Sequence, residues 1–278
     1  YRNLITSYLM NQPASLNSYT LNNGVQLVAF HPLILGTFQN RMEKMNFIVD
    51  LVVTRHLTTF THSVMVSYLA EAIGKHILAA RPELLRIPSS YLEGNVYASP
   101  AEVLDYIVPA ALFHDIGKNG MIPIINTQHR KLNDYEFNII QTHPQKGSDY
   151  LSSDPDFLIY QPVALGHHRS YDGTRGYPLS FDNTASPYRD AIDLIHICDC
   201  LDAATDYLSR NYHRAKPFDV VLNELKAGRG TEYNPDMVDV ILSDRELYND
   251  LKMLTEQNRE NIYYDIYLTF VNLRKKRQ

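Results

Sequence analysis

Apolar residues recur at three- and four-residue spacings through much of the chain, which is the period of an amphipathic helix. The pattern is clearest in four segments: Phe47–Ala80, Pro100–Phe113, Asn133–Leu151 and Pro187–Tyr207. Strand-like alternation is scarce after residue 40, and no internal repeat or low-complexity tract is present. This pattern predicts an all-α bundle.

Local signals mark two helix starts. Asn133 is followed three residues later by Glu136, the spacing of a capping box, and Ser186-Pro187 is typical of an N-cap with a first-turn proline. Before the second start, the stretch Tyr171–Pro187 is rich in Gly, Pro and Asp. Such a composition cannot form regular helix, so we predict a long functional loop there.

The two ends of the chain differ from the middle. Residues 1–45 contain Asn-rich turns and a candidate short strand at Gly24–Phe30, so we interpret them as an N-terminal extension or the remnant of an upstream domain. Residues 46–243 form the predicted main domain, and residues 244–278 a charged C-terminal helix with a basic end. The absence of an initiator Met at Tyr1 is consistent with a piece of a longer protein, with flanking sensory domains elsewhere.

Composition excludes several classes of protein. A hydrophobic fraction of 45% with 21% charged residues is typical of a folded domain, and a net charge of -5 gives no basic field for duplex DNA, RNA or an anionic membrane. No run approaches the roughly 20 apolar residues that span a bilayer. Cys198 and Cys200 point in different directions on a helix, so we predict no disulfide and a cytoplasmic location.

Histidine and aspartate residues recur at predicted helix ends and junctions. Imidazole nitrogen together with carboxylate oxygen suits divalent transition metals, whereas calcium prefers oxygen alone. A lone histidine such as His62 is more often a packing residue, so the prediction depends on the whole set. Seven side chains are too many for one tetrahedral ion, but a carboxylate can bridge two ions about 3.5–4 Å apart. The predicted ligands are His62, His114, Asp115, His143, His167, His168 and Asp199, with Asp115 as the bridge.

Polar neighbours surround these candidates. The sequence Ile116-Gly117-Lys118 follows His114-Asp115 at the end of an apolar helix, where unpaired charges would be costly. His196 and Asp202 lie one helical turn before and after Asp199, so they either orient that carboxylate or simply pack beside it.

Several motifs occur in a fixed order from about His62 to Leu242. They are HDIGK at 114–118, HP at 143–144 with Gly147, HH at 167–168, YDG at 171–173, GYP at 176–178, DCLDAAT at 199–205, RNYHRA at 210–215 and GRGTEYNP at 228–235. Together they resemble the HD-GYP family of metal-dependent phosphohydrolases, which belongs to the HD superfamily and serves bacterial signalling.

The resemblance implies an HD-type bundle that hydrolyses cyclic-di-GMP to linear pGpG, GMP or both, through a hydroxide activated by two metals. It implies two ions, Fe or Mn in first place and Zn, Co or Ni as alternatives. One ion would contact His62, His114, Asp115 and Asp199, and the other Asp115, His143, His167 and His168. Asp115 and Lys118 would be the catalytic residues, because the Lys118 ammonium can bind a phosphate oxygen or protonate the departing alkoxide.

The chain departs from the family pattern at several positions. Thr58 stands where members with a third metal carry Glu, so we predict two ions and not three. Arg169 and Ser170 replace the usual Glu and Arg, and the loop carries one extra residue near Arg175. The predicted substrate-binding residues are Lys118, Arg169, Arg175, Tyr177, Arg210 and Arg214.

Two other functions remain open at this point. One is an HD hydrolase for another cyclic dinucleotide or nucleotide, and the other is a weakly active module that senses a ligand or binds a partner. The GYP motif favours the cyclic-di-GMP class. A signalling protein could dock on the loop 171–187.

Overall fold

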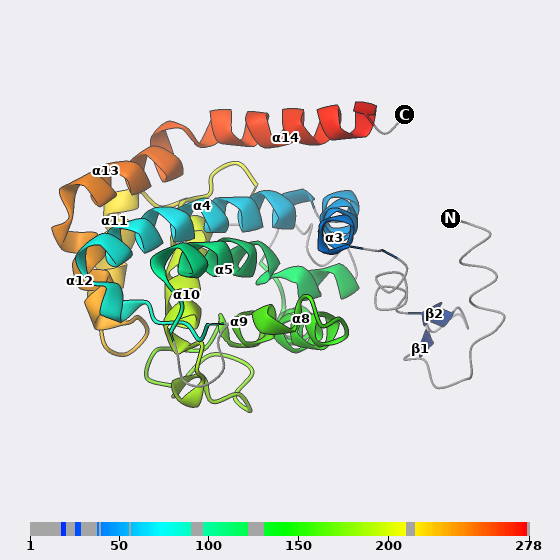
Figure 1. Cartoon of the computed structure of the whole chain (residues 1–278), viewed down its shortest axis with the longest axis horizontal. Helices are drawn as coiled ribbons and strands as arrows, with labels where there is room; N and C mark the ends of the chain where they lie inside the picture. Colours follow the sequence, from blue (N-terminus) through cyan, green and yellow to red (C-terminus); the bar gives the residue numbers. More distant parts are fainter. Residues whose placement is uncertain are drawn as a thin grey trace. The chain divides into compact units, whose positions relative to one another are not determined.

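The computed structural model describes residues 18–20, 26–28, 38, 40–55, 57–89, 97–121, 131–209 and 215–276. The chain divides into two compact units, Tyr1–Phe47 and Ile48–Gln278. In the first unit, β1 (Ser18–Thr20) pairs antiparallel with β2 (Gln26–Val28), which lies inside the predicted strand segment (Figure 1). Helix α3 (Arg41–Arg55) crosses the division between the units.

In the described part of the second unit, every regular secondary-structure element is a helix, which confirms the all-α prediction (Figure 1). None of the helices in the described ranges is both long and apolar enough to cross a membrane. The helices are α4 (Leu57–Ala80), α5 (Pro100–Phe113), α7 (Asp134–Ile140), α8 (His143–Ser152), α9 (Gln161–Gly166), α10 (Arg189–Thr205), α11 (Phe218–Ala227), α12 (Pro235–Ser243), α13 (Arg245–Lys252) and α14 (Arg259–Lys276). Short helical turns are η1 (Pro82–Leu84), η2 (Ile116–Gly120), η3 (Leu158–Tyr160), η4 (Asn183–Ala185) and the π-helical η5 (Met253–Gln257).

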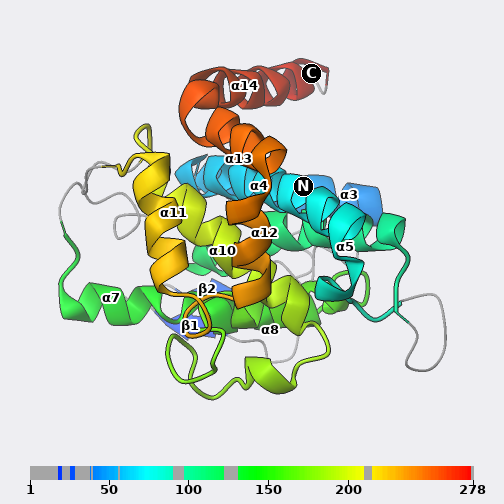
Figure 2. The ribbon, with the colours of Figure 1, turned by 90° about the vertical axis from the view of Figure 1, so that its left-hand side faces the viewer.

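Helices α4, α5 and α10 form the centre of this unit. Helix α4 packs along α5 and against α10, and α11 lies beside α10 on the other side (Figure 2). Every residue of α10 from Ala191 to Asp199 is buried. A helix that is buried all round can carry polar side chains only where they find partners, so the polar residues of α10 need explanation.

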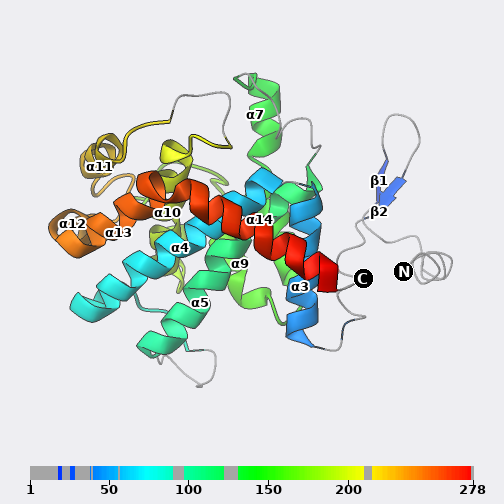
Figure 3. The same ribbon diagram turned by 90° about the horizontal axis from the view of Figure 1, so that it is seen from above.

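The C-terminal helix α14 lies over α4 (Figure 3). Ile262, Tyr263 and Ile266 of α14 form one buried cluster with Met65 of α4. This contact ties the end of the chain to the helix that carries the first candidate ligand.

The prediction of one continuous helix over Asn133–Leu151 is wrong. Its start is confirmed, since Asn133 and Glu136 make the reciprocal capping-box hydrogen bonds at 2.9 Å. However, α7 ends at Ile140 and α8 begins at His143, followed by Pro144. Proline has no amide hydrogen and clashes inside a helix, so it sits in the first turn of a new one.

Two other helix boundaries also differ from the prediction. Helix α10 begins at Arg189, because Ser186 is still extended (ψ 134°) and its hydroxyl accepts from the Tyr188 amide within the loop. The predicted C-terminal helix is α13 and α14 with η5 between them. Asn258 leaves helical geometry (φ -124°, ψ 5°), which divides the segment.

Candidate metal centre

The structure brings together all seven side chains predicted as metal ligands. Ligand atoms of Asp115, His143, His167 and His168 lie within 4.8 Å of one another, and those of His62, His114 and Asp199 form a second such group. They come from α4, the turn after α5, the first residue of α8, the turn after α9, and α10. Five distant segments therefore converge on one buried site.

A close backbone contact holds two of these segments together. A Cβ atom at Gly117 would lie only 2.0 Å from the carbonyl oxygen of His143 and 2.5 Å from the amide nitrogen of Gly147. Only a residue without a side chain allows η2 and the start of α8 to approach so closely. This contact sets Asp115, at the start of η2, against His143.

Asp115 lies between the two groups of ligands. Its Oδ1 is 3.1 Å from Nε2 of His143 and 3.7 Å from Nε2 of His167. Its Oδ2 is 3.7 Å from Nε2 of His62 and 3.6 Å from Nε2 of His114. One carboxylate oxygen therefore faces each group, which is the arrangement that a bridging ligand requires.

Asp199 also reaches both groups. Its Oδ1 lies 3.0 Å from Nε2 of His62, and its Oδ2 lies 3.6 Å from Nδ1 of His168. The two buried carboxylates thus line the space between the imidazole rings.

Hydrogen bonds orient the rings of four histidines. Nδ1 of His114, His143 and His167 lies 2.6, 2.7 and 2.9 Å from the carbonyl oxygen three residues earlier. A carbonyl only accepts, so Nδ1 carries the hydrogen and the Nε2 lone pair faces the site. Nδ1 of His62 meets the Asp202 carboxylate at 2.6 Å, so Nε2 is the ring nitrogen that faces the site. Among the described residues, Nε2 of His114 has no hydrogen-bond partner, which fits a metal ligand.

Burial keeps most of the imidazoles neutral. Desolvation lowers the pKa of His114 and His167, lowers the pKa of His168 well below its ordinary value, and lowers the pKa of His143 to about 4. Neutral imidazole is the form that binds metals, so these four rings need not release a proton.

The charged groups of the site compensate one another. Burial raises the pKa of Asp115, but the Lys118 charge, the electrostatic interaction with His114 and hydrogen bonds from His143 and His167 together hold it well below its usual range. Burial lowers the pKa of His62, but hydrogen bonds and charges from Asp199 and Asp202 outweigh it and raise this pKa to about 9. His62 must therefore lose a proton when a metal binds.

Lys118 stands at the edge of the site. Its Nζ lies 2.5 Å from Oδ2 of Asp115, and its side chain remains 19% exposed. It is thus a cation that contacts the central carboxylate and keeps access to solvent.

The predicted loop 171–187 contacts the site through Tyr177. The ring of Tyr177 lies 4.5 Å from the ring of His168, and Phe137 of α7 meets Tyr177 edge-on at 6.4 Å. Gly176 has φ +85°, and a Cβ there would lie 1.8 Å from the His168 carbonyl oxygen, so only glycine permits this close approach. Phe137 was missed from sequence, because nothing in its local pattern shows that α7 faces the loop.

The predicted arginine contacts have different outcomes. Arg169 is buried, and its guanidinium donates to backbone carbonyls of Gly173, Arg175 and Gly176. It therefore holds the loop from inside, which differs from the predicted peripheral phosphate contact. Arg175 is 58% exposed and pairs with Glu232 at 3.3 Å. The predicted residues Arg210 and Arg214 lie outside the described residues.

The two polar neighbours of Asp199 both touch the ligand set. His196 donates from Nδ1 to the His167 carbonyl oxygen at 2.7 Å, while Asp202 accepts from His62. Asp202 in turn meets Arg259 of α14, which the sequence did not reveal because it stands in a charged segment that looks solvent-exposed.

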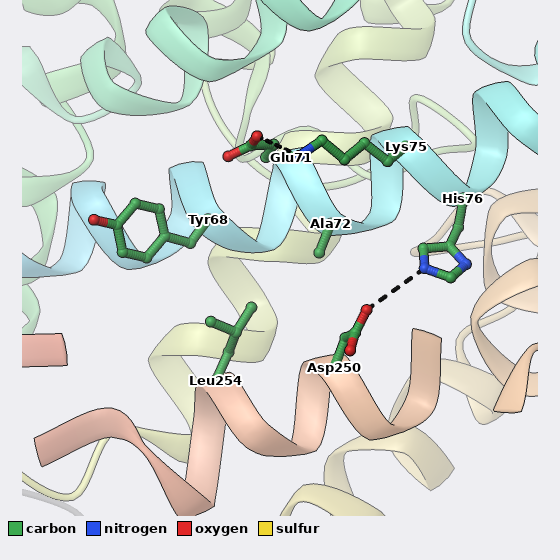
Figure 4. Close-up of a pocket in the computed structure, with 7 residues that line it drawn as sticks. All are labelled: Tyr68, Glu71, Ala72, Lys75, His76, Asp250 and Leu254. Carbon is green, nitrogen blue, oxygen red and sulfur yellow. Dashed lines mark hydrogen bonds and ion pairs between the residues drawn. The ribbon is translucent and has the colours of Figure 1, made fainter. Parts of the chain in front are cut away.

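A shallow pocket also lies between α4 and α13, and none of the seven ligands lines it (Figure 4). Its charged side chains pair with one another: Lys75 with Glu71 at 2.6 Å, and His76 with Asp250 at 3.6 Å. His76 also contacts Asp244. The ionisable side chains Glu71, Lys75, His76 and Asp250 that line this pocket are therefore all engaged in ion pairs.

Comparisons with known proteins identify the family of the chain. The sequence profile of the HD domain family matches residues 59–211. A cyclic di-GMP phosphodiesterase of Vibrio cholerae is 26% identical over 72% of this chain and 41% of its own length. The cyclic di-GMP phosphodiesterase response regulator RpfG of Xanthomonas campestris is 33% identical over 52% of this chain and 37% of its own. A 3'3'-cGAMP-specific phosphodiesterase 2 of Vibrio cholerae is 25% identical over 72% of this chain and 37% of its own. The chain thus spans less than half the length of these relatives.

Proposed function

We propose that this chain, which belongs to the HD domain family, hydrolyses a cyclic dinucleotide, with cyclic-di-GMP as the first candidate, by means of two divalent metal ions. The observation that carries the proposal is the position of Asp115, whose two oxygens face two separate groups of ligands. A buried carboxylate between two sets of imidazoles is suited to a dinuclear centre.

The donor set indicates the class of metal. Five imidazoles and two carboxylates fit Fe or Mn first, with Zn, Co or Ni as alternatives. Bound ions of this kind supply an activated water and neutralise phosphate oxygens. The residues that would hold them are His62, His114, Asp115 and Asp199 on one side, and Asp115, His143, His167 and His168 on the other.

Lys118 is the best-placed group for the substrate's charge. Its ammonium contacts Asp115 yet remains partly exposed, so it can donate to a phosphate oxygen or give a proton to the departing 3′ oxygen. In an acidic chain without a general basic field, such local cations and bound metals would hold an anionic substrate.

The aromatic pair Tyr177 and Phe137 supports a nucleotide substrate. Tyr177 lies next to the ligand His168, and Phe137 is 47% exposed beside it. Bases stack on such rings with about 1–3 kcal/mol per base, without a strong preference for one base. These rings would therefore hold a base of the dinucleotide while its phosphate meets the metals.

The identity of the dinucleotide is the finer part of the proposal. Two of the relatives described above are named for cyclic di-GMP, which favours that substrate. The relative named for 3'3'-cGAMP makes a second candidate, since it matches the same share of this chain as the first relative. Products would be the linear dinucleotide, the mononucleotide or both.

The test is a hydrolysis assay on metal-reconstituted protein. The chain is loaded separately with Fe, Mn, Co, Ni and Zn, incubated with cyclic-di-GMP, 3'3'-cGAMP and cyclic-di-AMP, and the products are separated by chromatography. We expect cyclic-di-GMP to be opened with at least one metal. Survival of all three substrates with every metal would refute the hydrolase, and cleavage of another substrate alone would refute the preferred one.

Two histidines of α4 supply a matched pair of variants. His62→Gln removes a proposed ligand and should abolish hydrolysis. His76→Gln changes the same residue type on the same helix but only loosens contacts with Asp244 and Asp250. Its activity should equal that of the wild type.

A further inference from the structure

Arg259, the first residue of α14, is the largest fully buried side chain among the described residues. Each part of its guanidinium has a partner: Nη1 donates to Oδ1 of Asp202 at 2.7 Å, Nη2 to Oγ1 of Thr205 at 2.8 Å, and Nε to the carbonyl oxygen of Thr255 at 3.0 Å. The group is therefore fixed by α10 on one side and by η5 on the other.

Asp202 connects this arginine to the candidate metal centre. Its carboxylate is fully buried, with Oδ1 on Arg259 and Oδ2 on Nδ1 of His62 at 2.6 Å. The opposite nitrogen of the same ring, Nε2, lies 3.0 Å from Asp199 and 3.7 Å from Asp115. A continuous chain of contacts thus runs from α14 to the space between the two carboxylates.

We propose that Arg259 is a positioning residue for the metal centre, which acts on His62 through Asp202. This inference rests on the proposed function, because it assigns His62 as a ligand. The planar guanidinium holds the carboxylate in one orientation, and the carboxylate holds the ring with Nε2 directed at the metal position. Arg259 lies beyond residues 59–211, so a segment outside the matched HD region completes the site.

The charges around Arg259 show why a neutral residue cannot replace it. Asp206 is also fully buried and lies 3.8 Å from Nη1 of Arg259. Without the guanidinium, the buried carboxylates of Asp202 and Asp206 would both lose the cation that contacts them. Removing one partner of a buried ion pair is strongly unfavourable, so the Asp202 carboxylate would turn away and release His62.

The experiment measures metal binding, not turnover. Wild type and Arg259→Met are titrated with Mn or Zn against a chromophoric chelator, and bound metal per chain is checked by elemental analysis. Loss of such a supporting partner weakens metal affinity by about 10–100-fold. We expect this loss for the ion beside His62, while the ion held by His143, His167 and His168 keeps its affinity. If Arg259→Met binds each of the two ions as tightly as the wild type does, the inference is overturned and the proposed function still stands.

A packing variant and a double variant distinguish positioning of His62 by Arg259 from a general loosening of α14. Ile266→Ala removes a buried side chain of α14 without touching a charge, and should keep both ions. If it loses the same ion as Arg259→Met, the effect is loosening of α14 and the inference fails. In an Asp202→Asn background, Arg259→Met should change the affinity less than about twofold, because the path through Asp202 is already cut. Additive losses would overturn the inference.

Misfolding of Arg259→Met does not remove the test. The double variant Asp202→Asn/Arg259→Met removes both partners of the buried pair and is then compared with wild type directly. It should lose the ion beside His62, and wild-type affinity for both ions would contradict the inference. If the wild type itself binds fewer than two ions, the proposed function fails and the inference fails with it.

Discussion

A methyl group at Gly117 would separate the two backbone segments that bring Asp115 and His143 together. Its Cβ would lie 2.0 Å from the His143 carbonyl oxygen, whereas real contacts of this kind are longer than 3.0 Å. The backbones must therefore separate by about 1 Å. Overpacking of this kind costs about 1–3 kcal/mol of stability. A displacement of about 1 Å at the reacting groups lowers a rate by about 10²-fold.

Gly120→Ala is the matched control in the same turn. A Cβ at Gly120 would meet only Cδ of Lys146, at an ordinary contact distance of 3.7 Å. Urea unfolding of the metal-free proteins, metal content and hydrolysis rate are measured for both variants. We expect Gly117→Ala to lose stability, metal and rate, and Gly120→Ala to keep all three. Gly117→Ala with the stability and metal content of Gly120→Ala would refute the role of this contact.

Three other variants test separate parts of the account. Lys118→Ala should keep two ions but lower kcat about 10²-fold, as judged by elemental analysis and steady-state kinetics; lost metal or an unchanged kcat would exclude the role. Phe137→Ala should raise KM for the dinucleotide with little change in kcat, since a stacked base is held equally in ground and transition states; an unchanged KM would exclude stacking there. Asp193 of α10 gives a pH test, because burial raises its pKa from 3.8 to about 7. The folded state then keeps a proton that the unfolded state loses, so the free energy of unfolding falls as pH rises from about 4 to 7, by up to about 1 kcal/mol per pH unit. Asp193→Asn should remove this dependence in urea unfolding at pH 5.5 and 8, and an unchanged slope would contradict the assignment.

The clustering of the seven proposed ligands could be predicted because their chemistry is local and their order is distinctive. His114-Asp115 and His167-His168 stand at helix ends, where a short turn can direct neighbouring side chains into one site. A metal site needs several such ligands, so the recurrence of these residues indicated one site. The break before His143 was missed because the apolar spacing of Asn133–Leu151 continues across it, although Pro144 marks the start of a new helix.

The supporting residues could not be predicted in the same way. Arg259 is 57 residues from Asp202 in sequence, and only the packing of α14 brings them together. Arg169 carries a residue type that binds phosphate, but burial under the loop directs its guanidinium to backbone carbonyls. In both cases tertiary packing decides what the charge contacts.

The most direct test of the proposed dinuclear centre is the number of metal ions bound per chain before and after Asp115→Ala. Both proteins are reconstituted without oxygen with Fe or Mn, freed of excess metal and measured by elemental analysis. We predict two ions in the wild type and one or none in the variant, because Asp115 is the proposed bridge, with one oxygen toward each ligand group. A single ion in the wild type, or two ions in both proteins, would contradict the account.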